Sequence, residues 1–228
     1  MQIAREMTTW YDRENPTFTG RLSYMFCSDY DTLVQTLQKH GFTVHTAASA
    51  EEARAIALTL VGTHSVGLGG SMTLAGLGMY EALCANGNVV FSHSVTPPAE
   101  DPYIFTKENS ADWYLASSNA ITLDGKLVNI DGTGNRVAGM FAGPKQVALI
   151  IGKNKLAEDV SAGYQRIKQV VAPKNAKRLN RKTPCAVDGT CHDCNAADRI
   201  CRVTTVIDYK PGWVKELHLI LTDAELGY

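Results

Sequence analysis

The 228-residue sequence predicts an α/β fold, in which a layered and mostly parallel sheet is flanked by helices. Two observations lead to this class. Short apolar segments typical of strands alternate along the chain with amphipathic segments long enough to be helices. In addition, Val147 to Ile151 form a continuous apolar run, as expected of a strand buried on both faces of a parallel sheet. We therefore expect one α/β domain over residues 1–228, with residues 1–20 as an N-terminal helical extension.

The first half of the chain contains two helices with clear start signals. Ser28-Asp29-Tyr30-Asp31 is typical of a capped helix start, and apolar residues then recur at helical spacing up to Leu37. Gly41 stands where a helix commonly ends. Ser49-Ala50-Glu51-Glu52 is a second capping box. A third helix is expected from about Thr73, and short strands are expected at 42–44, 65–68 and 88–91.

The second half keeps the same alternation. A hairpin is predicted around Asp124-Gly125, with its strands at 119–123 and 127–130. Apolar residues at helical spacing from Leu156 to Val171 predict a helix that ends before Pro173. The remaining strands are expected at 112–117, 203–207 and 217–221.

Composition and charge exclude several classes of protein. A hydrophobic content of 45% with a net charge of −1 is unlike a disordered chain, and a near-neutral charge disfavours a nucleic-acid partner. The stretch from Val66 to Tyr80 is too short and too rich in glycine to span a bilayer, and no secretory signal precedes it. We therefore expect a soluble cytoplasmic protein without a membrane or nucleic-acid partner. Homo-oligomerisation stays open.

Glycine-rich turns after strands indicate where a ligand could bind. In open parallel sheets, ligands lie beyond the carboxyl ends of the strands, where loops meet helix N-termini. The turn Gly69-Gly70-Ser71-Met72-Thr73 follows a strand and opens a helix, so its backbone can approach an anion and its hydroxyl groups can donate. A tight turn with a capping serine explains the same residues equally well. No dinucleotide fingerprint is present, and no NAD or flavin motif is visible.

A second turn, from Asp131 to Arg136, concentrates more polar groups than a hairpin exit needs. It contains Gly132, Gly134 and Asn135, and the guanidinium of Arg136 could hold a carboxylate or phosphate. The alternative is that Asp131 pairs internally with Arg136. Ser118 and Asn119 offer further polar groups ahead of the hairpin, although an Asx turn would also explain them.

Lys155 follows the buried strand in the segment Gly152-Lys153-Asn154-Lys155, which we expect to open a helix. A lysine at a helix N-terminus is unfavourable unless an anion offsets its charge. The predicted ligand is therefore a small anionic metabolite, and Asp131, Arg136 and Lys155 are the candidates for a catalytic role. None of the six histidines lies in a recognisable catalytic motif; His93, between a strand end and two prolines, is the one possible exception.

Four of the six cysteines fall in one short segment, with the pattern Cys185-x5-Cys191-x2-Cys194-x6-Cys201. In a reducing compartment such a cluster indicates a metal before disulfides, and four thiolates can hold one zinc ion or one iron–sulfur cluster. A basic stretch that begins at Pro173 precedes the cysteines, so residues 173–202 form a basic, cysteine-rich insertion. Four free thiols are the alternative.

Several of these motifs occur in the order found in a known family. The turns described above, together with Gly143-Pro144-Lys145, resemble those of the lactate-utilisation (LUD-domain) family. Thr183-Pro184-Cys185 and Arg199-Ile200-Cys201 resemble its short, cysteine-bearing subgroup. The resemblance runs from about residue 20 to residue 228. It implies a three-layer α/β fold similar to phosphosugar isomerases and CoA transferases (the NagB/RpiA/CoA-transferase-like fold), with the ligand held by glycine-rich loops.

The resemblance also implies a part in oxidising L-lactate to pyruvate, because some members act within a complex of iron–sulfur proteins. On that hypothesis the protein is a subunit or accessory of such a complex, and its four cysteines hold a 4Fe-4S cluster. The alternative is a stand-alone enzyme or binding module for a phosphorylated or carboxylated metabolite, with zinc as a structural clip. The appended ferredoxin-like motifs of a larger family member are not present in this sequence.

Overall fold

A six-stranded, entirely parallel sheet forms the centre of the computed structural model, which describes residues 28–143 and 145–228. Its strand order is β1-β10-β7-β4-β2-β3. The strands are β1 (Thr43–Ala47), β2 (Val66–Leu68), β3 (Val90–Phe91), β4 (Trp113–Ala116), β7 (Gln146–Gly152) and β10 (Glu216–Thr222). The expected mostly parallel α/β sheet is therefore present, and the predicted hydrophobic strand, β7, lies inside it between β10 and β4.

A smaller, mixed sheet packs beside the central one, with the strand order β8-β5-β6-β9. The strands are β5 (Ala120–Thr122), β6 (Leu127–Asp131), β8 (Leu156–Ala157) and β9 (Val203–Ile207). The predicted hairpin around Asp124-Gly125 is confirmed as the antiparallel pair β5 and β6. Gly125 adopts a φ of +77°, a backbone conformation that the hairpin turn requires and that glycine adopts without strain.

The helices are α2 (Ser28–Lys39), α3 (Ala50–Val61), α4 (Met72–Gly76), α5 (Met79–Ala85), α6 (Ile104–Ser110), α7 (Asn135–Phe141), α8 (Val160–Arg166), α9 (Ala172–Arg178) and α10 (Pro184–Asp188).

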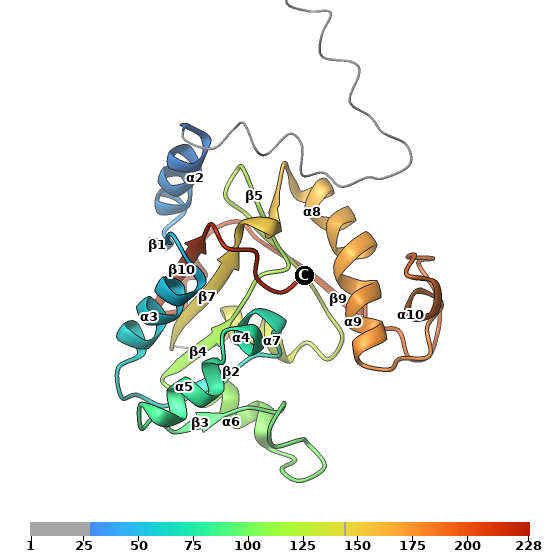
Figure 1. Ribbon diagram of the computed structural model, residues 1–228, viewed down its shortest axis with the longest axis horizontal. Helices are drawn as coiled ribbons and strands as arrows, with labels where there is room; N and C mark the ends of the chain where they lie inside the picture. Colours follow the sequence, from blue (N-terminus) through green and yellow to red (C-terminus); the bar gives the residue numbers. More distant parts are fainter. Residues whose placement is uncertain (1–27, 144) are drawn as a thin grey trace, which may run out of the picture.

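Side chains alternate between the two faces of the central sheet. In β7, Leu149 points into a core formed with α2, α7 and the small sheet, whereas Ile150 points into a second core formed with α3, α4 and α5. A third core joins the far face of the small sheet to the segment after α8. Figure 1 shows α8, α9 and α10 along the side of the molecule opposite to α2 and α3.

The start signal of α3 and the stop signal of α2 act as expected, whereas Ser28 is already the first residue of α2. Ser49 caps α3, because its hydroxyl accepts a hydrogen bond from the backbone N–H of Glu52. The Glu52 carboxylate accepts from the N–H of Ala48 rather than from that of Ser49, so the capping box is displaced by one residue. Gly41 follows α2 with a φ of +84°.

The prediction of one helix from Leu156 to Pro173 is wrong at both ends. Leu156 and Ala157 form strand β8, and the helix begins only after Asp159, whose carboxylate caps α8. The helix then continues through Pro173 into α9 by way of a π-helical segment, Ile167–Val171. The wider turn accommodates the proline, which has no N–H to donate to the helix.

The segment around Lys155 also differs from expectation. Lys153–Lys155 form a single 3₁₀ turn that leads into β8, instead of opening a helix. The predicted N-terminal helical extension, residues 1–20, lies outside the described residues. Within the described part of the chain, none of the helices is long and apolar enough to cross a bilayer.

Two stacked histidines make the stability of the sheet sensitive to acid. His45 Nε2 and His218 Nδ1 lie 3.1 Å apart, and burial lowers the pKa of both imidazoles below 6.5. As the pH falls below 6.5, the unfolded chain takes up protons that the folded chain binds less readily, so the folded state loses stability. We expect the urea midpoint of His45→Gln to depend less on pH in this range than that of the wild type.

Candidate functional site

A cavity of about 900 Å³ lies where loops from both sheets meet. Its walls come from the turn after β2, the turn after β4, the turn after β6 and the 3₁₀ turn after β7. Three of these strands belong to the central parallel sheet, so their carboxyl ends lie at the same edge. Ten of the residues predicted to bind a ligand line this cavity: Gly70, Ser71, Thr73, Ser118, Asn119, Asp131, Gly132, Asn135, Arg136 and Lys155.

The other two predicted residues, Gly69 and Gly134, do not line the cavity and shape the backbone instead. A Cβ at Gly69 would lie 2.6 Å from the hydroxyl of Tyr114, which is buried beneath the turn. Gly134 precedes α7 with a φ of +89°, in the left-handed region that favours glycine. Both glycines therefore set the path of the loops rather than offer groups to a ligand.

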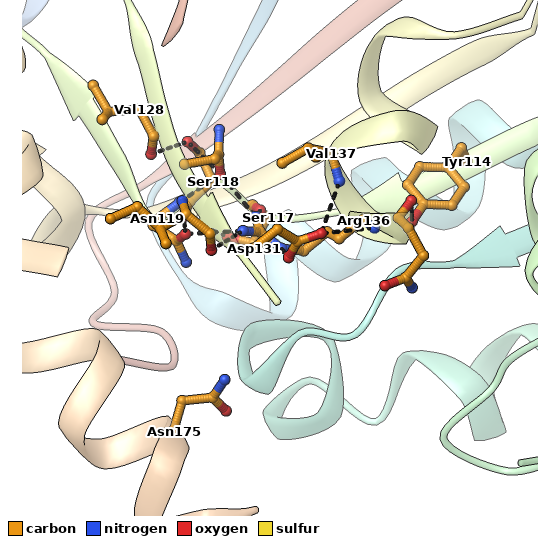
Figure 2. Close-up of polar contacts among 12 residues, drawn as sticks. Tyr114, Ser117, Ser118, Asn119, Val128, Asp131, Arg136, Val137 and Asn175 are labelled. Atoms are coloured by element: carbon orange, nitrogen blue, oxygen red, sulfur yellow. Dashed lines mark hydrogen bonds and ion pairs between the residues drawn. The ribbon is translucent and has the colours of Figure 1, made fainter. Parts of the chain in front are cut away.

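Arg136 is buried, and all of its donors are used within the protein. The five hydrogen bonds of its guanidinium run to Asp131 Oδ1 (3.3 Å), Ser117 O (2.9 Å), Asn129 Oδ1 (2.7 Å), Asn119 Oδ1 (2.8 Å) and Ile130 O (3.1 Å). Figure 2 shows Ser117, Asn119 and Asp131 gathered around it, with Asn175 of α9 apart from them at the bottom of the view. Since the guanidinium has five N–H groups, none is left for a ligand. The internal pair with Asp131, which the sequence left open as an alternative, is the arrangement found.

The remaining polar groups of these turns are also largely engaged. Asp131 Oδ2 accepts from the backbone N–H of Arg136, at the start of α7. Ser71 caps α4 by accepting from the N–H of Leu74. The Ser118 hydroxyl donates to the carbonyl of Ala120, 2.7 Å away. These side chains hold the loops in place, so a smaller set remains to meet a ligand.

Lys155 is the most unusual charged group of the cavity. Its side chain is buried, and its Nζ lies 2.6 Å from the Thr73 hydroxyl and 2.7 Å from the Ser117 hydroxyl. Among the described residues, no carboxylate pairs with it. Burial, together with the nearby charges of Arg166 and Arg136, lowers its pKa to about 7. The protein therefore holds a lysine that is half-charged near neutral pH at a cavity wall.

Two further features of the cavity favour an anion. Nδ2 of Asn135 is buried and has no hydrogen-bond partner among the described residues, so a donor is left over. Among the described residues that line the cavity, six side chains are cationic and two are acidic, although the whole chain carries a net charge of −1. The cations are Arg136, Lys155, Arg178, Arg181, Arg199 and Arg202, and the acids are Asp131 and Asp198.

A histidine and a glutamate form a pair that the sequence patterns did not join. His93 lies just after β3 and lines the cavity, and its Nδ1 is 2.7 Å from Oε1 of Glu108, which is completely buried in α6. The position of His93 between a strand end and two prolines was noticeable in the sequence. Glu108 gave no such signal, because α6 was not predicted and the two residues are linked only by the fold.

The cysteine segment lies beside the cavity. Cys201 lines it, whereas Cys185, Cys191 and Cys194 do not. Lys168 contacts Asp193 at 2.6 Å and so fastens the cysteine loop to the π-helical segment after α8, while Arg199, within the loop, contacts the same carboxylate at 2.9 Å. Burial raises the pKa of the Cys201 thiol, while the charges of Lys168 and Arg199 act in the opposite direction.

The donor set suits a thiolate-bound metal, although the described side chains do not close around one. Within residues 28–143 and 145–228, no three His, Cys, Asp or Glu side chains form a group that could hold a metal ion. Cys185 and Cys191 nevertheless lie close enough to Cys201 for their charges to raise the pKa of its thiol. Zinc and iron–sulfur clusters are commonly bound by four thiolates, and the two nearby cations would offset the charge of those thiolates.

Comparisons with known proteins bear on the family of the chain. A search of curated proteins found no match. Among solved structures, the chain is similar to a crystal structure of a DUF162 family protein from Deinococcus radiodurans. That match has 13% sequence identity and a TM-score of 0.48, and it covers 85% of this chain and 96% of that chain. The model of the LUD domain matches residues 30–222, a range that holds every strand of both sheets, the cavity loops and the cysteine segment. The chain therefore belongs to the LUD-domain family.

Proposed function

We propose that the protein takes part in lactate utilisation by binding a small carboxylate, L-lactate or pyruvate, in the cavity next to Lys155. In the fuller form of the proposal, it is a subunit or accessory of an iron–sulfur complex that oxidises L-lactate to pyruvate. Membership of the LUD-domain family supports the pathway. The observation that carries the binding site is Lys155, a buried cation with hydroxyl partners and no carboxylate partner among the described residues.

The physical reason is charge. A buried ammonium group that no anion offsets is unfavourable, and its lowered pKa records that penalty. A ligand carboxylate at hydrogen-bonding distance from Nζ would remove the penalty and would fill the donor left over on Asn135. In this proposal Lys155 and Asn135 contact the carboxylate. Arg136 and Asp131 hold the loop that carries Asn135, so they act on the ligand indirectly.

Ligand binding should be linked to proton uptake. Above pH 7 Lys155 is mostly neutral, and a bound carboxylate raises its pKa, so each binding event takes up a proton. Well below pH 7 the lysine is already charged, and uptake should vanish. We expect calorimetric titrations with pyruvate, in two buffers of different ionisation enthalpy, to show uptake approaching one proton about one unit above the pKa. Affinity should fall as the pH rises through this range.

Matched variants identify the group that takes up the proton. Lys155→Met should abolish both the uptake and most of the binding, whereas Lys153→Met, at the exposed neighbouring position, should change neither. Binding by the wild type without proton uptake would remove Lys155 from the site. An absence of binding by both lactate and pyruvate would overturn the proposed ligand class.

We also propose that Cys185, Cys191, Cys194 and Cys201 hold a metal centre, either a 4Fe-4S cluster or zinc. A cluster would supply an electron acceptor beside the cavity, whereas zinc would act as a structural clip for the loop. The positions of Lys168 and Arg199 support the proposal, because they place positive charge next to the thiols. The metal's identity decides between the redox-complex hypothesis and the alternative below.

Protein purified without oxygen should contain the metal in stoichiometric amount. A brown sample with iron and sulfide would indicate the cluster, and a colourless sample with zinc would indicate the clip. Cys191→Ser should lose the metal, whereas Cys84→Ser, an exposed cysteine in α5, should retain it. Metal-free protein from such a preparation, or a Cys191→Ser variant that keeps its metal, would contradict the assignment.

The alternative function, a stand-alone enzyme or binding module for a phosphorylated metabolite, has one observation in its favour. The cavity volume of about 900 Å³ is at the upper end for ligand sites and far exceeds that of a three-carbon acid. Arg178 and Arg181 lie at its wall and could meet a phosphate. Thermal stabilisation by inorganic phosphate that is lost in Arg181→Ala, without stabilisation by pyruvate, would favour this alternative.

A further inference from the structure

His93 and Glu108 form a tightly bonded pair at the wall of the cavity. Both the backbone N–H and Nδ1 of His93 lie close to the same carboxylate oxygen, Oε1 of Glu108, at 2.5 Å and 2.7 Å. Glu108 is completely buried, and its other oxygen, Oε2, has no hydrogen-bond partner among the described residues. The carboxylate therefore depends on His93 for its stabilisation.

This geometry fixes the tautomer of the imidazole. With Glu108 as a carboxylate, Oε1 can only accept, and both the backbone N–H and Nδ1 of His93 lie at hydrogen-bonding distance from it. Nδ1 must then carry a proton, and in the neutral ring the lone pair lies on Nε2. A carboxylate that orients a histidine in this way also stabilises the imidazolium that forms when Nε2 takes up a proton.

Nε2 is the ring nitrogen that Glu108 leaves without a partner. It makes no hydrogen bond with any described residue, and His93 lines the cavity. A Cβ built on Gly70 would lie 3.1 Å from Nε2, so the missing side chain of this glycine keeps the nitrogen accessible. The ring of Phe105, with its centroid 5.1 Å away, packs against the imidazole and restricts its orientation.

We propose that His93 is the acid–base residue of the cavity, and that Glu108 is its positioning residue. The substrate is a small carboxylate that bears an acidic proton, on a hydroxyl group or on a carbon next to a carbonyl group. This inference rests on the proposed function, because it takes the ligand to bind beside Lys155. His93 adds a role that carboxylate binding alone does not require.

The step is a proton transfer that balances without a redox partner. With pyruvate as the probe, a C–H bond of the methyl group breaks, its electron pair moves into the carbonyl group to give an enolate, and the proton passes to Nε2. The imidazolium is paired with the Glu108 carboxylate, and the cavity's cations oppose the charge of the enolate. Exchange of the imidazolium proton with D₂O, followed by return of a deuteron to carbon, regenerates pyruvate with a C–D bond.

The test measures this exchange and binding separately. Pyruvate is incubated with the full chain in D₂O, loss of its methyl proton signal is followed by NMR, and binding is followed by calorimetry. We expect the wild type to accelerate exchange and His93→Gln to lower the rate at least about 100-fold while still binding pyruvate. His64→Gln, a histidine whose Nδ1 bonds only to its own helix end, should behave like the wild type.

Glu108→Gln tests the positioning role. Its side-chain oxygen can still accept both hydrogen bonds, so the imidazole keeps its place while the stabilising charge is lost. We expect the affinity for pyruvate and the thermal midpoint to stay unchanged, while the exchange rate falls about 10-fold or more. A purely structural role would not lower the exchange rate alone.

Three results would overturn the inference. Exchange that persists in His93→Gln removes His93 from the role. Binding without exchange in the wild type refutes the acid–base step and leaves the binding function standing. Failure of the wild type to bind pyruvate refutes the proposed ligand as well as this step.

Discussion

Replacement of Arg136 by methionine should destabilise the fold by about 3–5 kcal/mol, because it removes one partner of a buried ion pair and of a buried polar network. Four oxygen acceptors besides Asp131 lose their donor, and these oxygens come from the turn after β4 and from β6. Methionine fills part of the volume but offers no N–H. The loops that form two walls of the cavity would therefore lose their common support.

The measurement is the urea unfolding midpoint, with two comparison variants. Arg136→Lys keeps the charge but replaces a planar group of five donors by three, so it should still be destabilising, by about 2 kcal/mol. Arg54→Met, on the exposed side of α3, should be close to neutral. A wild-type midpoint for Arg136→Met would show that the network contributes little.

The sequence predicted that some of these turns meet, because parallel strands place their carboxyl ends at one edge. Gly70 and Lys155 lie far apart in the chain, yet each follows a strand of the central sheet, and the alternation of strands and helices was visible. Arg136 follows β6 of the small mixed sheet, so this rule does not place it. The apolar run in β7 was equally clear, since a strand buried on both faces needs no polar side chains. Such features depend on local patterns that one sequence contains.

The pairing of side chains within the cavity could not be read in the same way. Whether Arg136 binds a ligand or Asn129 depends on the depth of its side chain, which the small sheet determines. Glu108 reaches His93 because β2 packs directly on α6: a Cβ at Gly67 would lie 2.0 Å from the carbonyl oxygen of Glu108. The π-helical segment before Pro173 likewise follows from tertiary packing, through Ile167 and Val171 in the third core.

In contrast to Arg136→Met, Lys155→Met should raise the free energy of unfolding, by about 1–4 kcal/mol at neutral pH. The ammonium group of Lys155 is buried without a carboxylate partner among the described residues, which costs stability. A methionine side chain has a similar length and carries no charge. The two hydroxyls that face Nζ keep other partners, since Thr73 donates to the carbonyl of Leu226 and Ser117 donates to that of Ile150. The variant therefore leaves no buried donor without an acceptor.

The pH dependence of this gain provides the sharpest measurement. The folded-state pKa of Lys155 is about 7 and its ordinary value is 10.5, so between these values the unfolded chain binds a proton that the folded chain does not. The wild type consequently loses stability as the pH falls through this window, and below it the loss is complete. The free energy of unfolding of Lys155→Met should be close to that of the wild type near pH 10.5. As the pH is lowered to about 7, it should exceed the wild-type value by a growing amount.

The exposed neighbour Lys153→Met controls for the general effect of removing a positive charge, and its midpoint should differ little from that of the wild type at any pH. If Lys155→Met is more stable yet no longer binds pyruvate, the lysine is retained for its ligand at the expense of the fold, as expected of a binding group. A less stable Lys155→Met would instead mean that the hydrogen bonds to the Thr73 and Ser117 hydroxyls outweigh the cost of burying the amine. Lys155 would then be part of the scaffold, and the carboxylate would need another cation.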